Sequence, residues 1–359
     1  MSELNAQNTE ELRQMCAKVA SGTPILPKDE ELFIATLSDF ECHDAVLKLL
    51  FRRIKEERAQ IADFCLLIRT HYLVSSNSPW KNLFFDFVNR FELSFTKLLS
   101  LMPSMFGDAS DAFLASLFEE LEPHFRHTEE RILCLLHIAL LNETRLFDER
   151  KTKQIYEKII LLEPLNYKAL CFFKTFYQYN RNWEQVANCL HLMLSLELST
   201  DEKSLHALDL AETALHHLRD PKSCLGLLDQ FCKKSNKRDL LEYQCHEALM
   251  DYEATINLLK RFLDAPQPEH RAAFIHYKIA ALYLRLESYP LALEHFFTSH
   301  RKFPKFFEPL EEIIQIGVEM DQQETVTQAL QLFAKSCEND ATKNKVQNLV
   351  AIFSKGAIN

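Results

Sequence analysis

Hydrophobic residues recur at the spacing of an α-helix along most of the chain. In the first third, apolar stripes with this period run over 45–72 and 80–101. Three segments that are polar or contain proline interrupt the pattern, at 24–28, 75–79 and 103–110. We therefore expect this part of the chain to form helices joined by loops.

From about residue 130 the pattern becomes periodic, because short turns recur and each is followed by a new apolar stripe. The residues that open the predicted second helices are Trp183, Pro221, Tyr252, Tyr289 and Gln323. Their successive intervals are 38, 31, 37 and 34 residues, which scatter around one length. An interval of this size is typical of a protein built from repeated structural units.

Prolines mark the ends of several units, because proline lacks an N–H group and disfavours helical geometry in the residue before it. These prolines are Pro164, Pro266, Pro268 and Pro304. Turns and prolines together divide the chain into six units, near 133–166, 167–200, 205–235, 236–272, 273–306 and 307–340. A final amphipathic helix from Ala341 is expected to cover the last apolar face. Its apolar side holds Val346, Leu349, Val350 and Phe353.

Four residues of the unit 273–306 form a recognisable motif. Tyr283 is followed by Ala292, Phe296 and Pro304. In the tetratricopeptide repeat, a tyrosine of the first helix likewise precedes A-x3-F and a closing proline in the second. The unit therefore resembles a tetratricopeptide repeat of ~34 residues, and the other units resemble it more weakly. The resemblance implies an all-α fold, an α-α superhelical solenoid of degenerate helix pairs.

The repeats do not extend over the whole chain. We divide it into a helical region over 1–130, a repeat array over 131–340, and a capping helix and tail over 341–359. The first region fits the repeat poorly, so it is either a set of eroded repeats or a separate helical domain that caps the array.

Composition supports a helical fold. Glycine accounts for only five of 359 residues, against about 7% in average proteins. Helices do not need glycine, whereas tight β-turns and phosphate-binding loops do. The ten cysteines follow no regular spacing, so we expect reduced thiols and a cytoplasmic location. No apolar run approaches the ~18 residues of a membrane span, and we expect neither membrane insertion nor a secretory signal.

The sequence lacks the common catalytic and cofactor motifs. It contains no G-x-x-x-x-G-K-[ST], G-x-G-x-x-G, G-x-S-x-G, H-E-x-x-H or C-x-x-C. The adjacent pair Cys245–His246 cannot easily hold one metal ion, because neighbouring helical residues point to different faces. We expect no catalytic residue, no metal site, no cofactor and no small-molecule ligand.

The resemblance also implies where a ligand binds. In tetratricopeptide arrays the first helix of each pair lines the concave groove. Carried onto this sequence, the groove positions are Lys168, Phe172, Thr175, Tyr179, His206, Asp209, Thr213, His217, Lys237, Gln244, Phe274, Tyr277, Lys278 and Arg285. The asparagine of the family's carboxylate clamp is missing from the ninth place, which holds Thr175, Thr213, Gln244, Ala281 and Gln315. Recognition of heat-shock chaperone tails is therefore not expected.

Two classes of function fit these features. The first is a scaffold or adaptor that binds a partner peptide or helix in the concave groove, with aromatic anchors for affinity and charges for orientation. The second is a helical-repeat RNA-binding protein, which reads bases with two or three side chains per repeat. The formal net charge of −10 disfavours the second, because binding to phosphate needs a basic surface.

Overall fold

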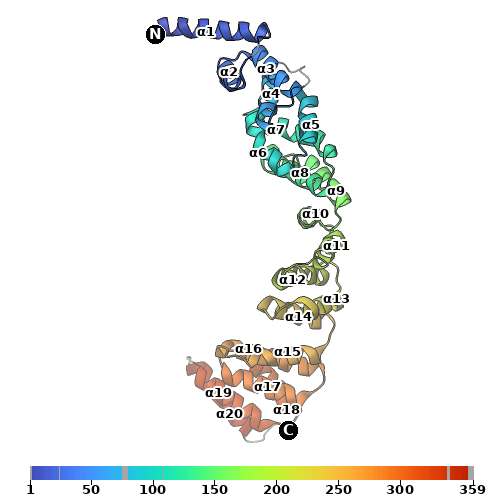
Figure 1. The fold of residues 1–359 in the computed structure, drawn as a ribbon. Coiled ribbons are helices and arrows are strands. Elements are labelled where there is room, and N and C mark those ends of the chain that lie inside the picture. The colour runs from blue at the N-terminus through green and yellow to red at the C-terminus, as the bar shows by residue number, and fades with distance from the viewer. Residues whose placement is uncertain (1, 24, 75–79, 108, 338–339, 355–359) are drawn as a thin grey trace. The chain divides into compact units, whose positions relative to one another are not determined.

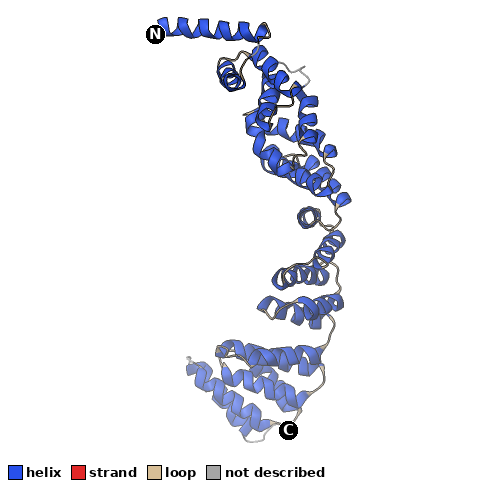
Figure 2. Cartoon of the chain, in the orientation of Figure 1, coloured by secondary structure: helices blue, strands red, loops and turns tan. Residues whose placement is uncertain are grey.

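The structure is a computed structural model that describes residues 2–23, 25–74, 80–107, 109–337 and 340–354. Within these ranges every regular element is a helix (Figures 1 and 2). The all-α class expected from the sequence is therefore confirmed. The chain forms two compact units, Met1–Phe172 and Phe173–Asn359. The expected boundary near residue 130 lies inside the first unit, and the three-part division stays a prediction.

The first unit is a run of helices in which each packs on a helix near it in the chain, either the next one or the next but one. Its elements are α1 (Ser2–Ala20), α2 (Pro27–Asp39), α3 (His43–Lys55), α4 (Ile61–Val74), α5 (Trp80–Arg90), α6 (Phe95–Phe106), α7 (Asp111–Leu121), η1 (Glu122–His124), α8 (Thr128–Leu141), η2 (Asn142–Leu146) and α9 (Glu149–Leu162). The next helix, α10 (Tyr167–Tyr179), contains the boundary between the units.

Aromatic rings fill the middle of the first unit. Tyr72 of α4 meets Trp80 of α5, Phe106 of α6 and Phe113 of α7, with ring centroids 5.7, 5.3 and 5.3 Å away. Edge-to-face and tilted contacts at these distances are favourable for aromatic quadrupoles. The abundance of phenylalanine in the sequence thus serves helix packing here.

Each of the two apolar stripes expected in this region is divided between two helices. The stripe over 45–72 belongs to α3 and α4, with a turn at Glu57, and the stripe over 80–101 belongs to α5 and α6, with a turn at Glu92. Both glutamates have positive φ, 53° and 45°, which reverses the chain without glycine or proline. The sequence therefore carries no strong signal for either turn.

Two of the loops predicted in this region differ from those in the structure. Pro27 begins α2 instead of lying in a loop, because the first position of a helix needs no N–H donor. Pro103 lies inside the last turn of α6, which continues to Phe106 and ends at Gly107, whose φ is 55°. The expected break at 75–79 lies outside the described residues.

The second unit consists of helix pairs, beginning with the end of α10. Its elements are α11 (Trp183–Leu194), α12 (Thr200–His216), α13 (Pro221–Phe231), α14 (Asn236–Ala248), α15 (Tyr252–Leu263), α16 (Glu269–Arg285), α17 (Tyr289–Lys302), α18 (Glu308–Glu319), α19 (Gln323–Ser336) and α20 (Asp340–Ser354). The five second helices α11, α13, α15, α17 and α19 begin at the five residues predicted from the sequence.

One turn geometry recurs before every second helix. The residue two places before the helix has a φ of 55° or 56°, and these residues are Arg181, Arg219, Met250, Glu287 and Asp321. In the turns before α11, α15, α17 and α19 the next residue donates its N–H to a carbonyl five residues earlier, for example Ser288 to Tyr283 at 2.9 Å. This is the Schellman termination of a helix. None of the five residues is glycine, so the turns form without the residue that most often adopts this conformation.

The fourth and eighth residues of every second helix are buried. These pairs are Val186 and Leu190, Cys224 and Leu228, Thr255 and Leu259, Ala292 and Phe296, and Val326 and Leu330. The A-x3-F motif is thus one instance of a position pair that is buried throughout the array. A small fourth residue lets the helices of a pair approach closely.

Two first helices begin earlier than expected. The unit expected from 205 opens with α12 at Thr200, and the unit expected from 273 opens with α16 at Glu269. Ser199 caps α12 in a reciprocal capping box with Glu202, which satisfies N–H groups at the helix start. Both helices are therefore longer at their N-terminal ends than the sequence pattern predicted.

The last helix covers the end of the array. In α20, Val346 is buried and Val350 and Phe353 pack on the apolar cluster of α17, α18 and α19. Leu349, expected on the same face, is 43% exposed. Its position on the helix places it at the edge of the covered face, so the stripe is narrower than the sequence suggested.

Gly317 of α18 offers a test of this close packing. A Cβ added at Gly317 would lie 2.5 Å from Cγ2 of Val326, which is buried. We expect Gly317→Ala to lower the free energy of unfolding by about 1–3 kcal/mol, because the core of this pair cannot accept another methyl group. Urea unfolding of the full chain measures the change.

The same substitution at Gly226 is the matched control. Gly226 lies in α13, and an added Cβ would have no heavy atom within 4 Å apart from its chain neighbours and the backbone of its own helix. Gly226→Ala should stabilise the chain by up to about 1 kcal/mol through helix propensity. In the double variant Gly317→Ala with Val326→Ala, the loss should be smaller than the sum of the two single losses. Equal effects at the two glycines would contradict the packing argument.

A histidine pair links α16 to α17. The Nδ1 atoms of His276 and His295 lie 3.0 Å apart, so one ring donates and the other accepts. Burial, together with the neighbouring His295, Lys302 and Arg301, lowers the pKa of His276 to about 4. The unfolded chain takes up this proton near 6.5. The stability that depends on neutral His276 is therefore complete above pH 6.5 and is lost as the pH falls towards 4.

We expect the melting temperature to fall between pH 7 and pH 4.5, and to fall less steeply in His276→Gln. The amide keeps a polar side chain at this position but takes up no proton in this range. Thermal unfolding followed by circular dichroism at several pH values gives the slope. His191→Gln, at an exposed position of α11, is the control and should retain the wild-type slope. If His276→Gln and the wild type lose stability in parallel, the pair does not titrate as described.

Candidate partner-binding surface

Ion pairs cross the first helices at the start of the second unit. Lys174 of α10 lies 3.3 Å from Asp209 of α12, and Lys237 of α14 lies 2.7 Å from Glu212 of α12 and 4.0 Å from Asp209. The hydrogen bond to Glu212 raises the pKa of Lys237. Asp209 and Lys237 were expected to contact a ligand. In the structure their charges instead join three consecutive first helices.

Three more candidates lie on α12 or, in the case of His217, directly after it, and they do not form a common surface. His206 and Thr213 are buried, so they present little area to a partner. Burial also lowers the pKa of His206, which favours the neutral ring. His217 is exposed but stacks on Trp183 of α11, with ring centroids 3.5 Å apart.

The candidates on α10 fall in both units. Phe172 belongs to the first unit and stacks on Tyr156 of α9 at 4.4 Å, and Lys168 is exposed one turn earlier. Thr175 and Tyr179 belong to the second unit, and the Tyr179 side chain is 90% exposed. Tyr179 is therefore the most accessible aromatic residue among the candidates.

The remaining candidates lie on α14 and α16. Gln244 is partly buried, and Tyr277 packs on Phe296 and Phe306 with centroids 5.6 and 5.2 Å away. The Arg285 guanidinium lies 5.5 Å from the ring of Tyr252. Phe274 is 50% exposed, and the Lys278 ammonium lies 5.5 Å from its ring.

A hollow of about 730 Å³ brings Phe274 and Lys278 together with residues of three helices. Its lining comes from α14, from the C-terminal end of α15 with the residues that follow it, and from α16, and we call the α14 and α16 residues its two walls. Its α14 residues are Asn236, Asp239, Leu240, Tyr243 and Glu247, and its α16 residues are Arg271, Phe274, Ile275 and Lys278. We call this the larger hollow. It lies between two successive first helices, where the resemblance implies a ligand.

A smaller hollow of about 400 Å³ adjoins it. It is lined by His270, Arg271 and Phe274 of α16 and by Phe303 and Phe306 in the turn between α17 and α18. We call this the smaller hollow. Four of its five residues have aromatic rings, so the smaller hollow is suited to an apolar group.

Most residues of the two hollows were not predicted from the sequence. Leu240, Tyr243, Arg271, Phe303 and Phe306 fall outside the family's groove positions. The sequence did contain one signal for this surface. Phe274 and Tyr277 are three residues apart, so they lie on one face of α16 and give it an aromatic character. The earlier start of α16 adds Arg271 to that face.

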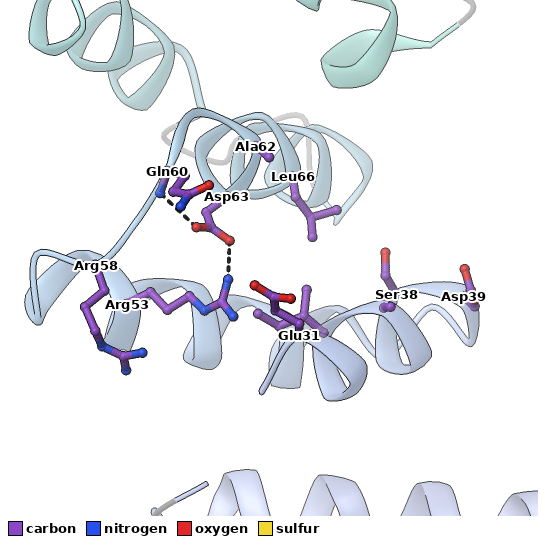
Figure 3. Close-up of a pocket in the computed structure, with 11 residues that line it drawn as sticks. Glu31, Ser38, Asp39, Arg53, Arg58, Gln60, Ala62, Asp63 and Leu66 are labelled. Atoms are coloured by element: carbon purple, nitrogen blue, oxygen red, sulfur yellow. Dashed lines mark hydrogen bonds and ion pairs between the residues drawn. The ribbon is translucent and has the colours of Figure 1, made fainter. Parts of the chain in front are cut away.

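The first unit contains a third hollow, of about 480 Å³, between α2 and the start of α4 (Figure 3). Three of its charged residues, Arg53, Arg58 and Asp63, form ion pairs with each other or with Glu30. Arg53 donates to Asp63 at 2.7 Å and to the fully buried Glu30 at 3.1 Å, while Arg58 donates to Glu30 at 3.2 Å. This network joins α2, α3 and α4.

We expect Arg53→Met to destabilise the first unit by roughly 3–5 kcal/mol, because it removes one of the two partners of a buried carboxylate. Chemical unfolding of the full chain measures the loss. Adding Glu30→Gln should recover part of it, since the uncompensated charge is then gone. Arg126→Met is the matched control, because the Arg126–Glu92 pair is 75% and 76% exposed and such pairs contribute at most about 1 kcal/mol. Similar losses in the two arginine variants would refute a special role for burial.

Two absences hold for the described part of the chain. None of its helices combines the length and apolar character needed to cross a membrane. Its histidine, cysteine, aspartate and glutamate side chains form no group of three or more arranged to hold a metal ion.

No protein-family model matches the chain, and no curated protein matches it in sequence. Among solved structures, similar folds occur in the APC/C hetero-tetramer Cut9–Hcn1, with 12% identity, a TM-score of 0.26 and coverage of 89% of this chain and 75% of that chain. Yeast Tom70 is 12% identical with a TM-score of 0.29, and the match covers 97% of this chain and 82% of that chain. Naa15/Naa10 bound to HypK-THB is 12% identical with a TM-score of 0.30, and the match covers 91% of this chain and 64% of that chain. These are likenesses of fold alone.

The repeat character therefore follows from this chain's own geometry. Second helices start at regular intervals, the same left-handed turn precedes each, and the same two positions of each second helix are buried. The protein is an α-α helical-repeat protein, and its repeats resemble the tetratricopeptide repeat.

Proposed function

We propose that the protein is a scaffold that binds a partner polypeptide on the first helices of its second unit, and that it is not an enzyme. The observation that supports this most is the half-exposed Phe274 ring between two adjacent hollows. Half of this side chain is open to solvent, and that half makes no packing contact within the protein. Covered by a partner, it would supply binding free energy in proportion to the apolar area removed from water.

The surroundings of Phe274 favour a polypeptide ligand. Leu240 is 56% exposed on the α14 wall and Phe303 is 37% exposed at the smaller hollow, so the apolar area extends beyond one side chain. Polar and charged groups border it on both walls of the larger hollow. An apolar centre with a polar rim is the usual composition of a protein interface.

Other first-helix residues contribute less to this proposal. Asp209 and Lys237 are engaged in ion pairs within the array, and His206 and Thr213 are buried. Tyr179 is a separate candidate anchor, because it is exposed at the end of α10. Phe274 is therefore the main anchor, and Tyr179 makes a second contact.

Affinity purification from the native source, compared between variants, tests the proposal. We expect Phe274→Ala to reduce recovery of the wild-type partner by about tenfold or more, as expected for an interface anchor. Phe274→Ala combined with Tyr179→Ala should abolish recovery without unfolding the array, which circular dichroism checks.

Leu291→Ala is the matched control, because Leu291 is 41% exposed on the second helix α17. It should recover the partner as well as the wild type does. Equal recovery by wild type and by the double variant would remove this surface from the function. A nuclease-treated lysate distinguishes a protein-binding scaffold from an RNA-binding protein. Loss of the partner after RNA digestion would favour the RNA-binding alternative.

A further inference from the structure

The larger and the smaller hollow share one wall. Arg271 and Phe274, one turn apart on α16, line both. A single polypeptide that crosses this wall therefore meets the larger hollow on one side, Arg271 and Phe274 in the middle, and the smaller hollow on the other side.

Each hollow offers its own apolar surface. In the larger hollow this surface includes Leu240 and Phe262, and in the smaller hollow it includes Phe303 and Phe306. The Phe274 ring lies 6.4 Å from the Phe306 ring, measured between centroids. Two bulky apolar side chains, one for each hollow, would cover exposed apolar area on both sides of Phe274.

The charge on the shared wall is positive and uncompensated. Arg271 is exposed and has no ion-pair partner among the described residues, whereas Arg261 of the same hollow lies 2.6 Å from Glu242. Lys278 lies two turns further along α16, with its ammonium 5.5 Å from the centre of the Phe274 ring. An arginine in this position is suited to a carboxylate, which its planar guanidinium binds with two hydrogen bonds.

The α14 wall of the larger hollow carries negative charge. Asp239 and Glu247 line the α14 side of the larger hollow, and the Tyr243 hydroxyl donates to Glu247 at 2.5 Å. An acidic group of a ligand would be repelled there and attracted to α16. The two walls therefore orient a ligand with its carboxylate towards Arg271.

We propose that this surface recognises a polypeptide segment with two bulky apolar side chains and an aspartate or glutamate between them. The apolar side chains occupy the two hollows and the carboxylate binds Arg271. This inference rests on the proposed scaffold function and specifies the chemistry of its partner.

Selection of a random short-peptide display library on the full-length protein tests the inference. The enriched peptides should share two large apolar residues that flank an acidic residue. Their affinity for Arg271→Glu should fall by about tenfold or more, and a new selection on that variant should replace the acid with lysine or arginine. Arg150→Glu is the control, because Arg150 is exposed on α9 outside the described hollows, and it should bind the peptides as the wild type does.

Three results would overturn the inference. They are a selection that enriches no peptide, enriched peptides without an acidic residue, and affinity for Arg271→Glu within about twofold of the wild type. The scaffold proposal is judged separately by the lysate experiment with Phe274→Ala. If that variant loses its partner while Arg271→Glu leaves peptide selection unchanged, the scaffold function stands and only the ligand chemistry is wrong.

Discussion

The structure depends on the burial of one apolar stripe per helix against its neighbours. A helix pair of this size cannot cover its own apolar faces, so each pair is stable only when the next pair packs on it. In the second unit the fourth and eighth positions of each second helix are buried, from Val186 and Leu190 to Val326 and Leu330. At the end of the array, Val346, Val350 and Phe353 of α20 cover the face that has no further pair.

This requirement explains how the polar residues are used. Because side chains of successive first helices lie next to each other, charges on them meet across helices, as Lys174, Asp209 and Lys237 do. Such partly exposed pairs contribute little stability each, but they remove charges from the surface that a partner could use. The part of the first-helix surface around Phe274 differs, because its aromatic and aliphatic side chains remain exposed and Arg271 keeps its charge uncompensated among the described residues.

The two hollows depend on a detail of helix length. The start of α16 at Glu269 extends the helix N-terminally, so Arg271 stands one turn before Phe274 on the same face. The turn between α17 and α18 then places Phe303 and Phe306 beside that face. Recognition by shape and by a few anchors fits a repeat protein, in which a rigid backbone presents side chains from several helices at once.

The sequence by itself determined the helical class, the starts of the five second helices and the buried A-x3-F positions, because these follow from local periodicity and from turn residues near in the chain. It did not show the turns at Glu57 and Glu92, since residues without a special preference adopt the left-handed conformation there when packing requires it. Only the tertiary structure decided which groove candidates are available. His206 and Thr213 are buried, Asp209 and Lys237 are paired, and Leu240, Arg271 and Phe303 join Phe274, because these outcomes depend on contacts between residues distant in the chain.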